Sequence, residues 1–331
     1  MRGAAEGSDF CEDRLVKAAT SVQARRALVL FALMSVIWGI PYLLIRVAVA
    51  EISPATLVFA RTGLGTLVLL PIALLRTDFR AVLRRWRWVV AFAVAEIGVP
   101  WVLLGSAEQH VTSSLAGLLV AGVPLVGTVI AVGSGSRDRV GATGLVGLLV
   151  GLAGVAAIIG VNLGSSDTTA LLEMGVVVVG YAVGPAILSR RLAGLSSVGV
   201  MALSLSLCAL VYAPIAVLQR PATVPSADAL VSVVILGVVC TALAFVLFSA
   251  LIDEIGPVRA TVITYINPAV AALLGVVVLS ESFTAGMAIG FGLVILGSTL
   301  AIRPARPGAA DPQVAIGDGR PAQAGADEPV A

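Results

Sequence analysis

Charged residues are scarce in this chain. Only 12% of its 331 residues are Asp, Glu, Lys or Arg, whereas an ordinary soluble domain carries about 25%. A single histidine is present, and 59% of the residues are hydrophobic. The apolar runs are long enough for helices that cross about 30 Å of hydrocarbon, and they are too long for the strands of a membrane barrel. The sequence therefore predicts an all-α integral membrane protein.

The motifs of several enzyme classes are also missing. The sequence holds no Walker A stretch, no HExxH or DDxxD motif and no GxSxG with a histidine nearby. Its three cysteines show neither CxxC nor Cys/His spacing, which excludes a disulfide framework and a cysteine-based metal site. We therefore expect no enzyme, no catalytic residue, no cofactor, no metal and no nucleic-acid partner.

Ten transmembrane helices are predicted by a hydropathy window of about 19 residues. They lie near 27–49, 54–75, 88–107, 112–132, 141–161, 169–189, 196–217, 229–251, 259–280 and 284–302. Eighteen of the 21 basic residues fall in the two tails and in alternate loops, and only Arg220 falls in the remaining loops. Because basic residues accumulate on the cytosolic side, we expect a multi-pass protein of the cytoplasmic membrane with both termini in the cytosol.

The two halves of the chain resemble each other at a shift of about 143 residues. "GLLVGLAG" from Gly147 aligns with "GFGLVILG" from Gly290, and Trp38 falls opposite Tyr181. Since each copy holds five helices, the second copy enters the membrane in the opposite direction. Such inverted repeats are typical of secondary transporters, whose substrate site lies between the halves near the midplane. The expected organisation is a cytosolic leader, two repeats and a disordered cytosolic tail, at residues 1–26, 27–161, 169–303 and 304–331.

A family resemblance rests on the order and spacing of several features. Trp38 and Gly39 are followed by Tyr42 and Arg46, and the second helix carries Arg61 early. The later stretch reads "ALIDEIGPVRATVITYINPAVAALLGVVVLSE". In these features the chain resembles the drug/metabolite transporter superfamily, specifically its ten-helix exporters with two EamA repeats. The resemblance implies export of small polar or amphipathic metabolites, such as amino acids, or of drugs.

One predicted helix face carries three candidate site residues. Trp38, Tyr42 and Arg46 recur every four residues and form one stripe, with Pro41 beside it favouring a kink. Trp38 lies deeper than the usual aromatic belt, which favours a cavity wall. Two interpretations of Arg46 stay open, because its long side chain can face the cavity mouth or reach the lipid headgroups.

Two charges are predicted inside the membrane. An unpaired Arg61 there costs about 2.5 to 3.5 kcal/mol, and Glu96 is either its structural partner or a substrate or proton site. Tyr265 and Asn267 next to Pro268 line a pore or belong to the packed core. The predicted substrate-cavity residues are Trp38, Tyr42, Arg46, Arg61, Glu96, Trp101, Tyr181, Tyr265 and Asn267. The predicted hinges are Pro41, Pro100 and Pro268.

The sequence thus predicts a secondary active transporter that exports a small amino-acid-like metabolite or a drug by alternating access. Its expected partners are a small-molecule substrate, membrane lipid and protons as a candidate coupling ion, and it is expected to act as a monomer or homodimer. Two alternatives stay open: a membrane assembly subunit without transport, and an intramembrane enzyme.

Overall fold

A computed structural model describes residues 25–133, 142–162, 167–255 and 263–301. The expected leader and tail lie outside the described residues, except that Arg25 and Arg26 already begin the first helix. Within the described ranges the chain is helical and contains no strand. The predicted all-α class is therefore confirmed.

The helices of the first half begin with a helix over 25–37. It is followed by α2 (Pro41–Ala48), α3 (Pro54–Arg76), α4 (Phe79–Arg84), α5 (Trp86–Phe92), the π-helix η1 (Ala93–Gly98), α6 (Val99–Ala107), α7 (Ser113–Val120), α8 (Val123–Gly133) and α9 (Ala142–Asn162). The second half holds α10 (Thr168–Arg191), α11 (Ser197–Leu218), α12 (Ala227–Val234), the π-helix η2 (Ile235–Leu243), α13 (Ala244–Ile255), α15 (Ile263–Leu279) and α16 (Ala285–Ala301).

These elements form the ten predicted spans. Eight continuous helical stretches are long and apolar enough to cross a membrane, and α15 and α16 are shorter apolar helices. The third span, for example, runs over Trp86–Ala107 through α5, η1 and α6, against a predicted range of 88–107. Several spans begin where a polar side chain accepts a hydrogen bond from the first helical turn. These N-cap residues are Ser53, Thr112, Asp167, Ser196 and Ser226.

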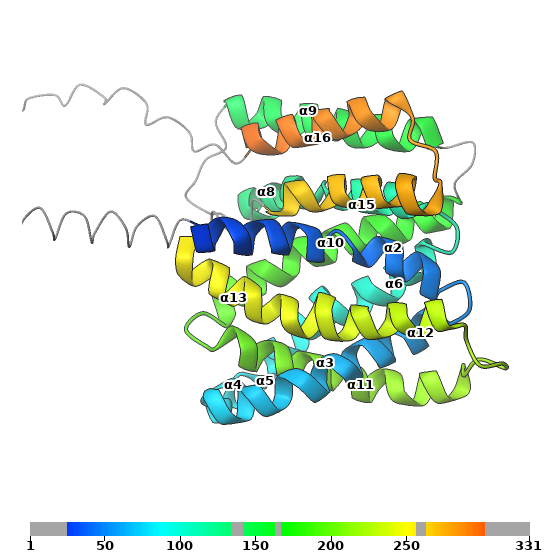
Figure 1. Ribbon diagram of the computed structural model, residues 1–331. Helices are drawn as coiled ribbons and strands as arrows, with labels where there is room; N and C mark the ends of the chain where they lie inside the picture. Colours follow the sequence, from blue (N-terminus) through cyan, green and yellow to red (C-terminus); the bar gives the residue numbers. More distant parts are fainter. Residues whose placement is uncertain (1–24, 134–141, 163–166, 256–262, 302–331) are drawn as a thin grey trace, which may run out of the picture.

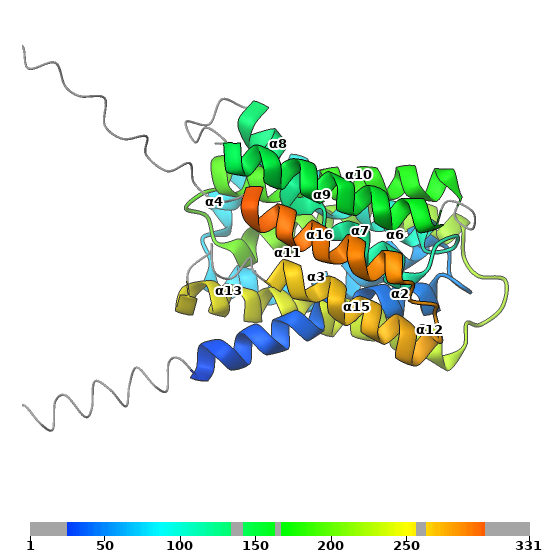
Figure 2. The same ribbon diagram turned by 90° about the horizontal axis from the view of Figure 1, so that it is seen from above.

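Helices at equivalent places in the two halves pack against each other. The second spans, α3 and α11, pair along one edge of the bundle, and the fifth spans, α9 and α16, pair along the opposite edge (Figure 1). The view from above in Figure 2 shows α9 and α16 again side by side. Both edges of the bundle are therefore made by one helix from each repeat.

The contact between α9 and α16 is made by backbone. A methyl group on Gly154 would lie 2.7 Å from the carbonyl oxygen of Gly290, and one on Gly147 would lie 2.7 Å from the carbonyl oxygen of Gly297. The first motif glycine of each repeat thus meets the second motif glycine of the other repeat. This antiparallel register is what an inverted repeat requires, and only glycine permits so close an approach.

We expect Gly297→Ala to destabilise the fold by about 1 to 3 kcal/mol, because the added methyl overlaps the backbone of α9 in a tightly packed contact. Gly292→Ala in the same helix is the matched control, since nothing lies within 4 Å of a methyl group there. Thermal unfolding of both variants in detergent measures the difference. Equal unfolding temperatures for the two variants would contradict the backbone contact.

Candidate functional site

The third span of each repeat departs from α-helix at the same place. In η1 the N–H of Val99 reaches the carbonyl of Val94, and in η2 the N–H of Ala244 reaches that of Val239. These are the bonds over five residues that define a π-helix, and π-helical segments are frequent at functional sites. A shift of 143 residues carries η1 onto η2. The two segments therefore occupy equivalent places in the two repeats.

The surroundings of η1 fix both of its ends. The hydroxyl of Tyr212 donates to the carbonyl of Gly98 at 2.9 Å, and the thiol of Cys208 approaches the carbonyl of Ala93 at 3.7 Å. On the other side, Gly184 of α10 leaves room for the Glu96 side chain, because a methyl group at this glycine would overlap the carboxylate. The π-helix thus carries Glu96 into the contact with α10.

Glu96 does not pair with Arg61. Its Oε2 is buried and has no hydrogen-bond partner among the described residues, and no ion pair joins the two side chains. The structural pair that the sequence allowed is therefore not formed. Glu96 instead lies within electrostatic range of Tyr181.

Arg61 is stabilised by other groups. It is 7% exposed, its Nε donates to the hydroxyl of Thr241 at 3.0 Å, and its guanidinium lies 3.6 Å from the ring centroid of Trp101. A cation over an indole face in a desolvated place contributes about 2 kcal/mol or more. The Thr241 hydroxyl in turn donates to the carbonyl of Leu236 within η2. The π-helix of the second repeat therefore positions the group that holds the buried cation of the first.

Polar side chains of both repeats meet around this cation. Tyr42, Tyr181 and Glu108 lie within electrostatic range of Arg61, and Trp101 hydrogen-bonds the Tyr181 hydroxyl. Tyr181 also packs against both hydrophobic clusters of the protein. We call these residues the Arg61 cluster. Its members are Tyr42, Arg61, Trp101, Glu108, Tyr181 and Thr241.

Glu108 is an acid that the sequence analysis missed. It follows the last residue of the third span, is fully buried, and both its carboxylate oxygens lack a hydrogen-bond partner among the described residues. Burial raises the pKa of Glu108 well above its usual range, the Glu281 carboxylate raises it further, and Arg46 and Arg61 lower it.

The helical stripe of the first span is divided between two places. Residues 38–40 form a turn between the first helix and α2, and Pro41 begins α2. Trp38 at this break packs on Phe248 and Phe245, with ring centroids 4.7 and 5.8 Å away. Tyr42 belongs to the Arg61 cluster. The predicted role of the stripe as one cavity wall stays a prediction.

Arg46 lies at the end of α2 and is half-buried. Its guanidinium donates to the backbone carbonyl of Glu108, which is a favourable place for a cation because it caps the C-terminal end of α6. Of the two interpretations left open, headgroup snorkelling does not describe this contact. Arg46 instead joins α2 to the end of α6.

The residues of α15 contact the break in the first span. With its amide nitrogen facing both carbonyls, Asn267 donates to Ser35 at 3.0 Å and to Ile263 at 2.9 Å. The buried Tyr265 hydroxyl has no partner among the described residues. Neither residue belongs to the Arg61 cluster. Their predicted role in a cavity stays a prediction.

The three predicted hinges differ in structure. Pro41 follows the turn at 38–40, and Pro100 lies at the start of α6, directly after η1. Pro268 lies inside α15, which continues as α-helix from Ile263 to Leu279. Two of the prolines thus coincide with a departure from α-helix, whereas Pro268 does not.

The end of the bundle where α2 stops is closed by carboxylates that cap helices of the opposite repeat. Glu281 accepts hydrogen bonds of 2.6 to 3.0 Å from the N–H and hydroxyl groups of Ser113 and Ser114 at the start of α7. Glu51 accepts two bonds of 2.6 Å from Ser226 at the start of α12, and these bonds lower the pKa of Glu51. Carboxylates at helix N-termini are favourable because of the unpaired N–H groups and the helix dipole.

Comparison with protein families agrees with this architecture. The model of the EamA-like transporter family matches residues 25–160 and again residues 169–303. This chain belongs to that family. The match covers most of the chain and falls twice, once on each set of five helices, so the resemblance predicted from the sequence is confirmed.

Other comparisons of this EamA-like transporter show the fold alone. One crystal structure is 23% identical in sequence and superposes with a TM-score of 0.61, over 83% of this chain and 96% of its own. No curated protein matches the chain. The family and the structural match thus establish a multi-pass membrane protein with a transporter fold.

We expect Glu281→Gln to destabilise the protein by about 1 to 3 kcal/mol, because an amide cannot accept at both ends as the carboxylate does and one buried donor loses its partner. Glu51→Gln, which changes the exposed cap at the same end, is the control and should cost less. Thermal unfolding of the two purified EamA-like variants checks the order. A larger loss for Glu51→Gln would refute a dominant role for the buried cap.

Proposed function

We propose that this protein is a secondary transporter that exports a small amino-acid-like metabolite or a drug by alternating access, with the Arg61 cluster as its substrate site. The observation that supports this most is the convergence of α2, α3, α6, α10 and η2 on one buried cation. A site between inverted repeats is where secondary transporters bind their substrates. One chain supplies both halves of the cluster, so a monomer, alone or within a homodimer, is the transporting unit.

The chemistry of the cluster favours a solute with both charges and an apolar part. A guanidinium binds a carboxylate through paired hydrogen bonds. The unpaired carboxyl groups of Glu108 and Glu96 offer acceptors for an ammonium group. Trp101 and Tyr181 beside Arg61 provide aromatic surface. An amino acid or an amphipathic cation carries these complementary groups.

The closed caps suggest how access alternates. By the distribution of basic residues, the end closed by Glu281 and Glu51 is the outer one. At the other end Arg26 contacts Glu254 of α13 at 3.2 Å, with Arg26 66% exposed. We infer that release to the outside requires Glu281 to leave the N-terminus of α7, whereas the inner contact is an ion pair whose cation is exposed to water and therefore screened.

Energy for export is proposed to come from protons bound at Glu96. A carboxyl group without a protein partner in a buried place can take up and release a proton as its access to water changes. Glu96 satisfies this condition because its Oε2 is buried and unpaired among the described residues. The intramembrane-enzyme alternative is not proposed, since the Arg61 cluster holds no paired nucleophile and base.

The proposed location in the cytoplasmic membrane with cytosolic termini predicts the readings of reporter fusions. Fusions after Arg85 and after Arg303 should both report cytosol, and a fusion after Ser226 should report the outside, because the basic residues lie in the first two regions. Alkaline phosphatase and a fluorescent protein are suitable opposite reporters. An external reading at either arginine would overturn the orientation.

Transport itself is tested in two stages. Metabolite profiling of the medium from cells with and without the gene identifies the exported solute. Purified protein in liposomes should then move that solute against its gradient when a pH gradient is imposed. We expect Glu96→Gln to lose this uphill flux but keep downhill exchange and folded protein. Arg61→Gln should weaken substrate binding by on the order of tenfold or more, as expected for loss of a charged hydrogen bond.

The matched control is Glu173→Gln. Glu173 is also a carboxylate of a membrane helix, but its Oε1 accepts a 2.9 Å hydrogen bond from the hydroxyl of Ser106, whereas the Oε2 of Glu96 has no partner among the described residues. Wild-type flux that ignores the pH gradient would exclude the proton role alone. Absence of any flux of the profiled solutes in liposomes would contradict the transport proposal as a whole.

A further inference from the structure

The backbone that presents Glu281 at the outer end of the bundle is unusual. α15 ends at Leu279, and Ser280 follows with a φ of 56°. It is the only residue other than glycine with a positive φ in the part of the chain that the structure describes. Few residues besides glycine adopt this left-handed region, because Cβ then approaches the following carbonyl oxygen. Ser280 therefore holds local strain next to the residue that closes the outer end.

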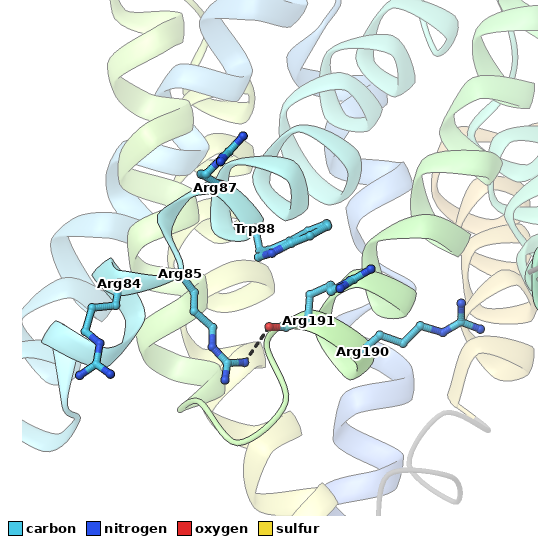
Figure 3. A pocket seen from close by; sticks show the side chains of 6 residues that line it. All are labelled: Arg84, Arg85, Arg87, Trp88, Arg190 and Arg191. Atoms are coloured by element: carbon cyan, nitrogen blue, oxygen red, sulfur yellow. Dashed lines mark hydrogen bonds between the residues drawn. The ribbon is translucent and has the colours of Figure 1, made fainter.

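The opposite end of the bundle shows the ordinary form of such a turn. After α10 ends at Arg191, the left-handed residue is a glycine, Gly194, with a φ of 80°. Arg85 donates to the carbonyl of Arg191 at 2.7 Å, which Figure 3 shows as a dashed line. Since glycine has no Cβ, the turn after α10 takes its shape without strain. The turn after α15 takes the same kind of backbone with a serine.

The strained turn places Glu281 against the end of its own helix. The N–H of Glu281 reaches back to the carbonyl of Gly275 at 3.1 Å, which satisfies one of the carbonyls left open at the end of α15. Gly275 is buried, and a methyl group on it would overlap Oε2 of Glu281 and the hydroxyl of Ser114. Glycine at this position therefore leaves the space that the carboxylate occupies.

Hydrogen bonds from α7 hold the carboxylate in that space. Ser113 and Ser114, both fully buried, donate to it through their N–H and hydroxyl groups at 2.6 to 3.0 Å. The end of α15 disfavours a carboxylate, since a helix C-terminus is the negative end of the helix dipole. The bonds to α7 thus act against the strain of Ser280 and against the dipole of α15. A closed state balanced in this way opens at moderate cost, as alternating access requires.

We propose that Ser280 is the hinge of an outer gate formed by Glu281, Ser113 and Ser114. Its left-handed backbone turns Glu281 onto α7 in the closed state, and relief of the strain favours the open state. This inference rests on the proposed function, in which Glu281 leaves α7 for release to the outside. Ser280 acts by positioning Glu281. Because its side chain is exposed, substitutions there change the backbone preference without leaving a cavity in the core.

Hydrogen exchange at the amides of Ser113 and Ser114, the gate amides, measures the opening directly, because both donate to Glu281. In the purified full-length protein, mass spectrometry at single-residue resolution gives rates proportional to the open fraction. We expect Ser280→Gly and Ser280→Asn, which tolerate left-handed backbone, to slow exchange at both amides by on the order of fivefold. Ser280→Val should accelerate it by a similar factor, since β-branched residues tolerate positive φ least.

Three controls separate the hinge from other causes. The Ser226 amide, which Glu51 holds in the second outer cap, should keep its exchange rate in every Ser280 variant. Ser282→Gly adds flexibility at an exposed residue of the same loop and should not slow exchange at the gate amides. Gly275→Ala fills the space of the carboxylate and should accelerate exchange at the gate amides by on the order of tenfold.

Two outcomes would overturn the hinge. Equal exchange at the gate amides in all Ser280 variants would show that the strain does not set the opening. Equal slowing at the gate amides and at Ser226 would show general stabilisation of the fold. If Ser280→Val does not fold, the order of wild type, Ser280→Asn and Ser280→Gly decides. Failure of the proposed function looks different, because exchange would then follow the expected order while liposomes show no flux with any variant.

Discussion

The backbones of α9 and α16 touch each other, and much of the architecture depends on this contact. Inside a bilayer no hydrophobic force draws helices together, so close packing of small residues has to do it. Gly147 and Gly154 meet Gly297 and Gly290 in reversed order, so the two helices cross in one register only. The same contact explains the sequence repeat at this place, because the close approach of the two backbones requires glycine in both copies.

The membrane interior treats the two buried charges of the first repeat differently. Arg61 is satisfied by an indole face and a threonine hydroxyl, which are neutral groups that leave its charge available. Glu96 has no hydrogen-bond partner among the described residues, and neutralising it by protonation costs less than keeping it charged there. A direct ion pair would have tied the two charges to each other. The separation of the two groups is what the proposed roles require, namely substrate binding at Arg61 and proton exchange at Glu96.

Properties that depend on local sequence could be predicted. The lengths of the apolar runs predicted the spans, and the predicted range 54–75 corresponds to the helix Pro54–Arg76. The spacing of the glycines predicted the internal repeat. Residue type alone also marked Arg61 and Glu96 as buried charges. The hydrogen-bond partner of Arg61 was beyond this reasoning, because Thr241 is 180 residues from Arg61 and an ordinary threonine in the sequence.

Other site residues were missed for a similar physical reason. Glu108 follows an apolar run and reads as a loop residue, and the groups that interact with it, Arg46 and Glu281, come from distant parts of the chain. Glu281 was noticed as part of a family stretch, but its partners Ser113 and Ser114 belong to the other repeat. The π-helix η1 also has no local signature, since the side chains that bond its carbonyls, Tyr212 and Cys208, come from α11. Long-range contacts therefore set most of the site.

Each π-helix holds one residue more than an α-helix would need to cover the same length of the span. Each residue of an α-helix turns the chain by about 100° and advances it by 1.5 Å. If η1 returned to regular α-helix, α6 beyond it would have to rotate by about that angle against α5. Trp101, three residues past η1, would then leave the face of Arg61, while the span would lengthen by only a fraction of a turn. The geometry of the site therefore depends on how α6 is rotated against α5 within the same span. A small change in the length of this span would be enough to move Trp101 off the Arg61 guanidinium.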